Sequence, residues 1–165
     1  MSDIWSAQTL WRALEDTALS RPDLPCLSIP SREERDYHQQ GLLWSYGEVA
    51  ERVEGLIEHY GAKGYGHGHR VSLLLENRPE FMLHFLALNA LGCWVIPLNP
   101  DFRQDDLAHI MGHSDVDLVV TLGQHAGNLE TARDSLGRST PIIDVDGFET
   151  ALTAATRLGR NAPPG

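Results

Sequence analysis

The chain has 165 residues, of which 42% are hydrophobic and 22% are charged. This length and composition suit a globular domain with an apolar core and exclude a chain that is disordered throughout. The 23 acidic residues outnumber the 13 Lys and Arg residues and give a formal net charge of -10. Such a charge repels phosphate backbones and anionic membrane surfaces, so we expect no nucleic acid partner.

No segment has the pattern of a membrane span or a secretory signal. The most apolar stretch, residues 81–98, is interrupted by His84, Asn89, Gly92 and Pro97. A spanning helix needs about 20 mainly apolar residues, so this stretch predicts a buried helix that runs into a buried strand. The first nine residues contain no basic region followed by an apolar run, and the cytoplasm is therefore the expected location.

Residues 1–45 predict a helix followed by an antiparallel hairpin. Apolar side chains with helical spacing begin at Leu10 and end at Ala18. Two apolar runs, 26–29 and 42–44, flank a polar stretch, which is the pattern of a hairpin with a long solvated loop. The charged run 32–36 is interpreted as the surface of that loop.

Residues 46–158 alternate between helix and strand patterns. Ser45 and Glu48 form a capping box at the start of a helix that ends near Tyr60. Strands are expected at 71–75, 94–98, 118–122 and 141–145, and further helices at 79–91, 104–113, 128–136 and 148–158. The alternation predicts an α/β fold with a mainly parallel sheet flanked by helices. The side chains expected in its core are Leu73, Leu75, Phe85, Val95, Val119 and Ile143.

The chain is thus divided into an N-terminal helix and hairpin (1–45), an α/β subdomain (46–158) and a linker-like tail (159–165) that contains Pro163 and Pro164. We interpret the whole as a single truncated domain. Cys26 and Cys93 are expected to be buried free thiols, because their spacing matches neither a disulfide framework nor a metal site.

Several short motifs lack the context that their chemistry needs. The glycines at 64, 66 and 68 follow a helix and precede a strand, the reverse of a phosphate-binding loop. His67 and His69, in the same connection, are expected to be solvated. His109 and His113 have the spacing of a zinc pair, but Ile110 stands where the zinc-protease motif has its general-base Glu, and a zinc site needs three or four ligands.

Two more motifs are incomplete. Asp144 and Asp146 begin like a calcium loop, but Phe148 occupies the third acidic place. No G-x-S-x-G run of a serine hydrolase occurs. We therefore assign no catalytic, cofactor-binding or metal-binding residue.

Four segments, in their order along the chain, resemble adenylate-forming ligases of the acyl-CoA synthetase kind. Residues 9–27 resemble the first helix and the P-D approach to the hairpin, and 43–49 resemble the first core motif, L-T-Y-x-E-L. Residues 68–81 resemble G-D-R-V-A-L-L-L-x-N-x-P-E-F, and 88–100 resemble the second core motif with its P-L-N-P turn. The departures, at Trp44, His69 and the Cys93-Trp94 pair, lie in capping or packing segments.

The resemblance implies a known reaction. Members of the family activate a carboxylate with ATP and magnesium, release pyrophosphate and pass the acyl group from acyl-AMP to a thiol such as that of CoA. This chemistry uses a Gly/Ser/Thr-rich loop ending in Lys, an acidic magnesium ligand, an Asp for the ribose and a distal Lys. The family has these groups beyond the matched region, and Lys63 lies in the wrong loop to replace either lysine. We therefore expect an N-terminal fragment that is inactive by itself, with ATP, magnesium and CoA as cofactors of the complete enzyme only.

The expected partners are the remainder of the ligase, in the same or another chain, and a second copy of the chain, because an incomplete domain exposes apolar surface. The pairs Glu76-Asn77 and Asn99-Pro100 follow two strands and are expected to border a pocket at the carboxyl edge of the sheet. Two alternatives stay open. Besides the ligase fragment, the chain could be a self-contained, non-catalytic α/β binding module related to the family, or an interaction piece that docks on another chain.

Overall fold

The computed structural model describes residues 9–156. Helix α1 (Leu10–Ser20) begins where the side chain of Thr9 accepts a hydrogen bond from the backbone of Arg12. It is followed by strands β1 (Pro25–Ile29) and β2 (Leu42–Ser45), which pair antiparallel. The predicted N-terminal helix and hairpin are confirmed.

Helix α2 (Tyr46–Ala62) starts at the predicted capping box. The hydroxyl of Ser45 accepts from the backbone N–H of Glu48, and the Glu48 carboxylate accepts from the backbone N–H of Ser45 at 2.8 Å. These bonds satisfy two donors that the first turn of a helix otherwise leaves unpaired.

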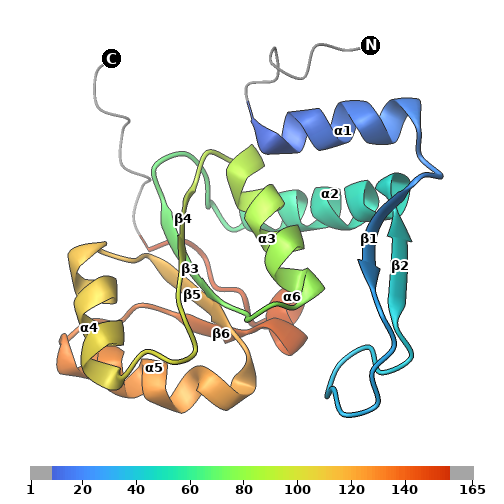
Figure 1. The fold of residues 1–165 in the computed structure, drawn as a ribbon. Coiled ribbons are helices and arrows are strands. Elements are labelled where there is room, and N and C mark those ends of the chain that lie inside the picture. Colours follow the sequence, from blue (N-terminus) through green and yellow to red (C-terminus); the bar gives the residue numbers. More distant parts are fainter. Residues whose placement is uncertain (1–8, 157–165) are drawn as a thin grey trace.

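The main sheet has the order β4-β3-β5-β6, with every neighbouring pair parallel. Its strands are β3 (Arg70–Leu74), β4 (Trp94–Pro97), β5 (Leu118–Thr121) and β6 (Ile142–Asp144). The connecting helices are α3 (Pro79–Ala90), α4 (Gln104–His113) and α5 (Gly123–Ser135), and β6 runs into a short 3-10 turn (Val145–Gly147) and α6 (Phe148–Ala151). The predicted α/β fold with a parallel sheet is confirmed (Figure 1).

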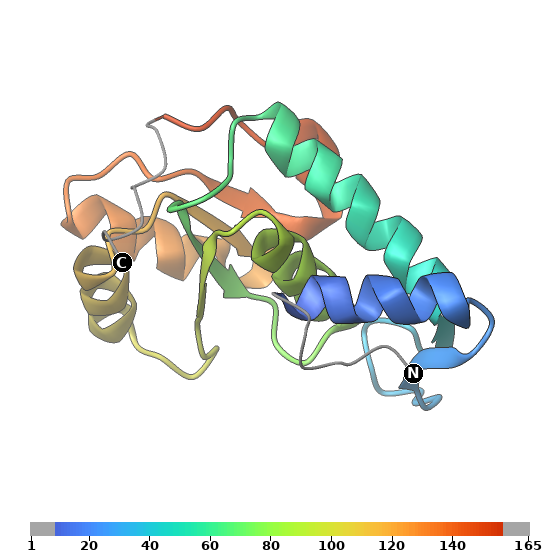
Figure 2. The same cartoon turned by 90° about the horizontal axis from the view of Figure 1, so that it is seen from above.

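Helices cover both faces of this sheet. Leu73 of β3 packs into a core with side chains of α2 and α3, whereas its neighbour Leu74 packs into a second core with side chains of α4 and α5. Successive residues of a strand point to opposite faces, so one apolar run supplies both cores. Figure 2 shows α4 and α5 on one side of the sheet and α1, α2 and α3 on the other.

Two predicted helices have wrong boundaries. Helix α5 begins at Gly123 rather than at 128. The helix expected at 148–158 stops at Ala151 because Leu152 is extended, and 152–156 are not helical. Residues 157 and 158 of that prediction lie outside the described part of the chain.

Two predicted core residues are only half-buried. Val95 lies on β4, which is an edge strand and therefore lacks a neighbour on one side. Phe85 stacks on Phe81 along a groove between α1 and α3. The other four expected core residues are buried: Leu73, Leu75, Val119 and Ile143.

His69 and Cys26 also differ from the predictions. His69 is only 3% exposed, because its ring packs against Tyr65 and its Nδ1 lies 3.0 Å from the carbonyl oxygen of Gly66. Cys26 is a free thiol but half-buried, whereas Cys93 is buried as expected, and burial raises the pKa of the Cys93 thiol to about 12. No helix within residues 9–156 is both long enough and apolar enough to span a bilayer.

Candidate functional site

The strand order creates a switch point between β3 and β5. The chain leaves β3 toward β4 on one side of the sheet and later returns to form β5 on the other side. In open parallel sheets, ligands bind in the crevice that such a reversal leaves at the carboxyl ends of the strands. The segments that emerge there are 75–78, after β3, and 122–125, after β5.

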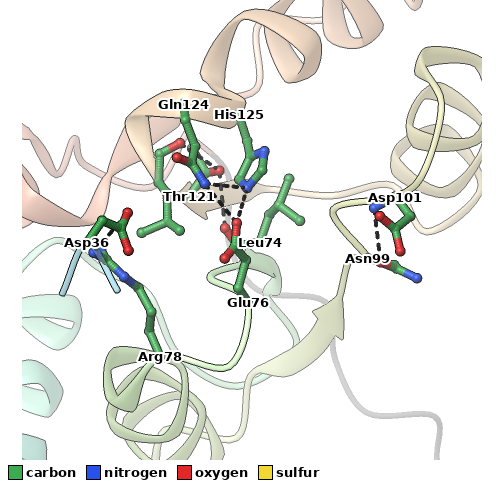
Figure 3. A network of polar contacts seen from close by, with 10 residues as sticks. Asp36, Leu74, Glu76, Arg78, Asn99, Asp101, Thr121, Gln124 and His125 are labelled. Carbon is green, nitrogen blue, oxygen red and sulfur yellow. Dashed lines mark hydrogen bonds and ion pairs between the residues drawn. The ribbon is translucent and has the colours of Figure 1, made fainter. Parts of the chain in front are cut away.

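A carboxylate, an amide and an imidazole meet at this switch point (Figure 3). Oε1 of Glu76 accepts a hydrogen bond of 2.8 Å from the Gln124 amide and lies 2.7 Å from Nε2 of His125. Glu76 has a backbone φ of 55°, in the left-handed region. Such a conformation is uncommon outside glycine, and it turns the carboxylate toward the first turn of α5.

The position of Glu76 complements the start of α5. Leu122, at the N-cap of this helix, makes no side-chain cap, and the first N–H groups of a helix carry a partial positive charge. The carboxylate of Glu76 supplies negative charge there. Asp144 at the end of β6 also approaches, because a Cβ added to Gly123 would lie 2.6 Å from its Oδ2. Glycine at 123 therefore permits this contact.

Beside the network lies a cavity of about 850 Å³. Both predicted pairs, Glu76-Asn77 and Asn99-Pro100, line it, together with residues of β1 and of the start of α3. The expectation that these pairs border one pocket is therefore confirmed. The side chain of Asn99 accepts a hydrogen bond of 3.0 Å from the backbone of Asp101, which fixes the turn after β4.

The hairpin loop closes one side of this cavity. Tyr37 donates a hydrogen bond of 3.5 Å to the carbonyl oxygen of Asn77. The guanidinium of Arg78 lies 4.5 Å from the centre of the Tyr37 ring and 3.9 Å from Asp36, and its side chain is 12% exposed. The positive charge of Arg78 is thus directed toward the loop.

The motifs that the sequence analysis set aside lie elsewhere. The glycines at 64, 66 and 68 connect α2 to β3, as expected. The rings of His109 and His113 stack with their centres 5.9 Å apart on α4. In the described range, 9–156, no three His, Cys, Asp or Glu side chains are placed to hold a metal ion.

The carboxyl edge can therefore orient an imidazole and attract positive charge. Its acidic groups are Glu76, Asp101 and Asp144, and its imidazole belongs to His125. Gln124 and His125 could not be identified from the sequence, because nothing in their local pattern signals a contact with residue 76.

Comparisons with known proteins agree with this architecture. The family model described as "AMP-binding enzyme" matches residues 14–164. Crotonobetaine/carnitine--CoA ligase of Salmonella paratyphi A is 29% identical over 142 residues, which are 85% of this chain and 26% of the relative. Phosphinothricin tripeptide synthetase PhsC of Streptomyces viridochromogenes is 27% identical over 149 residues, which are 88% of this chain and 12% of the relative.

Solved structures show the same fold. The N-terminal domain of FACL13 from Mycobacterium tuberculosis superposes with a TM-score of 0.75 and 20% identity, over 96% of this chain and 39% of that one. A fatty acyl CoA synthetase of the same organism gives a TM-score of 0.74 at 22% identity, over 89% of this chain and 28% of that one. The chain thus spans between an eighth and two fifths of the length of these proteins. Because the family model matches almost all of its length, the chain belongs to the family of AMP-binding enzymes.

Proposed function

We propose that the chain serves as part of the nucleotide-binding domain of an ATP-dependent acid:thiol ligase, which converts a carboxylate to acyl-AMP and then to an acyl-CoA thioester. The observation that carries the proposal is the family match over residues 14–164, and the fold shared with the N-terminal domain of FACL13 supports it. The proposed cofactors of the whole reaction are ATP, magnesium and CoA. The proposed partner is the remainder of the ligase, and the proposed location is the cytoplasm.

The residues at the carboxyl edge of the sheet do not fit the triphosphate of ATP. The carboxyl edge presents Glu76, Asp101 and Asp144, which repel a polyanion. Arg78, the cation that lines the cavity there, lies across Tyr37 and close to Asp36. A phosphate cradle needs backbone N–H groups or cations that point at the anion, so we assign no step of the reaction to these residues.

The proposed contribution of the chain is the frame of the site. The contact between Glu76 and the first turn of α5 fixes the connection after β3 against the connection after β5. Both connections leave the sheet at the switch point, where ligands of such sheets bind. A rigid edge at this position would form one side of the ligand site, and the remainder of the ligase would supply the phosphate-binding groups on the other side.

Exposed apolar side chains support a partner for this chain. Leu10 is 60% exposed and Met82 is 44% exposed, and both line the groove between α1 and α3. Contiguous apolar surface of this kind marks protein contacts. We propose that the remainder of the ligase covers it.

The proposal is tested by reading the coding region beyond Gly165 and expressing the longer product. A Gly/Ser/Thr-rich stretch that ends in Lys is expected soon after this residue, and the longer product should release pyrophosphate from ATP when a carboxylate is present. A longer product that carries this stretch but binds no ATP would contradict the proposal. If ATP stabilises the 165-residue chain without turnover, the self-contained binding module is favoured instead, because a ligand stabilises the state that it binds.

A further inference from the structure

A second cavity, of about 840 Å³, lies between α2, α3 and the turn that contains α6. It shares no lining residue with the cavity at the ends of β3 and β4. Its apolar floor is formed by Leu56, Leu83, Val145 and Phe148. Five acidic residues surround this floor: Glu51, Glu58, Glu80, Asp146 and Glu149.

The basic groups of this cavity are already engaged. The guanidinium of Arg52 donates a hydrogen bond of 2.8 Å to the carbonyl oxygen of Glu48 and lies 4.3 Å from the centre of the Trp44 ring. Nε2 of His59 lies 2.6 Å from the carbonyl oxygen of Glu149. The carboxylates therefore outnumber the cations, and the cavity favours a positively charged occupant.

One buried side chain offers a hydrogen-bond donor to the cavity. His84 is 3% exposed and lines the cavity, and its Nδ1 lies 2.9 Å from the hydroxyl of Tyr60. Burial lowers the pKa of His84 to about 3, so the ring is neutral and carries one proton. The hydroxyl of Tyr60 is fully buried and must donate its proton to an acceptor, which is Nδ1 of His84. The ring proton of His84 then sits on Nε2, which has no hydrogen-bond partner among residues 9–156.

A buried acceptor lies on the same cavity. Oε1 of Glu80 is 3.7 Å from Nε2 of His38, whereas Oε2 of Glu80 is buried and has no hydrogen-bond partner in the described part of the chain. Buried polar atoms without partners are uncommon in folded proteins, so this oxygen is a candidate acceptor for a bound donor. The cavity thus offers a carboxylate oxygen that needs a donor and an imidazole N–H that needs an acceptor.

We propose that this cavity binds a basic segment of polypeptide, with one arginine side chain directed to Glu80. A guanidinium supplies the donors that Oε2 of Glu80 needs, and its planar fork matches a carboxylate. The backbone carbonyl of the same segment accepts from Nε2 of His84. Apolar side chains beside the arginine cover the half-buried Leu56 and Val145, and the remaining carboxylates attract the segment as it approaches.

The probe is a blocked Leu-Arg-Leu peptide, with a Leu-Glu-Leu peptide and free arginine amide as controls. Binding to the 165-residue chain is measured by calorimetry. The arginine peptide should bind more tightly than either control, and its affinity should fall as salt rises. Glu80→Gln should weaken its binding by about tenfold or more, because the guanidinium then lacks its charged partner. Glu149→Gln should weaken it less, since that group lies at the rim.

The matched control is Glu130→Gln, on the exposed part of α5 and outside the cavity. It removes the same charge and should leave the affinity unchanged. The melting temperature of each variant shows that it is folded. Equal losses for Glu80→Gln and Glu130→Gln, equal binding of the two peptides, or no binding at all would overturn the proposal. Arginine amide that binds as tightly as the peptide would also overturn it, in favour of a small cation.

Discussion

The buried pair of Tyr60 and His84 predicts a sensitivity to acid that a defined substitution removes. Burial lowers the pKa of His84 from 6.5 to about 3. The unfolded chain therefore takes up a proton near pH 6.5, whereas the folded chain takes it up only near pH 3. Because the unfolded state binds more protons in this window, the free energy of unfolding falls as the pH is lowered through it. Between pH 7.5 and pH 5 this group alone should lower stability by about 2 kcal/mol.

The control is a double variant, Tyr60→Phe with His84→Leu, which replaces both polar groups and leaves neither partner unpaired. Urea denaturation at several pH values gives the free energy of unfolding of both proteins. The other titratable groups are common to the two proteins, so the difference between the curves isolates His84. The original chain should lose about 2 kcal/mol relative to the variant when the pH falls from 7.5 to 5. Parallel curves would refute the argument that His84 is buried and neutral.

Three further predictions concern packing, capping and the start of α5. Leu73→Ala should lower the free energy of unfolding in urea by about 2–5 kcal/mol, because the side chain is fully buried. The control Leu43→Ala, at a side chain that is 62% exposed, should change it by no more than about 0.5 kcal/mol. Similar costs for the two variants would contradict the burial pattern. Ser45→Ala should lower stability by about 1 kcal/mol, because it removes the cap of α2; an unchanged melting temperature would contradict this. Gly123→Ala should bring less than the roughly 1 kcal/mol that Ala gains over Gly in a helix, because its Cβ would lie 2.6 Å from Oδ2 of Asp144 and displace that carboxylate. The variant Asp144→Ala should relieve that cost, and equal effects in both backgrounds would count against the contact.

The centre of the main sheet could be predicted because β3 and β5 are apolar runs buried on both faces. Residues 71–74 and 118–121 can be identified as strands without knowing which strands they pair with, since apolar runs between helical patterns are typical of parallel strands. The start of α2 was predictable for a similar reason, because its capping box is a local pattern of two residues.

The boundary errors come from weak local signals. The sequence Gly123-Gln124-His125 contains a poor helix former at its first position, yet α5 begins there, where Glu76 supplies charge from the connection after β3. Conversely, the residues after Ala151 have helical composition, but Leu152 is extended and buried in the core shared by α2 and α3. Contacts with distant parts of the chain thus determine where α5 begins and where α6 ends.

The candidate site was predicted only in part. The rule that ligands bind at the carboxyl ends of parallel strands identified Glu76-Asn77 and Asn99-Pro100, and both pairs line the cavity. The contact between Glu76 and His125 joins residues 49 positions apart. No periodicity or motif in a single sequence reports such a pair, because it depends on the order of the strands.

The central claim is that this chain frames the site of an adenylate-forming ligase and lacks the groups that act on phosphate. Its most direct test is pyrophosphate release from ATP, magnesium and a panel of carboxylates, measured side by side for the 165-residue chain and for a product extended through the lysine-ending loop and the distal lysine. The account predicts release by the extended product and none above buffer by the chain alone, since loss of even one electrostatic donor costs about 100-fold to 1,000-fold. Release by the chain alone that survives Lys63→Gln would contradict it.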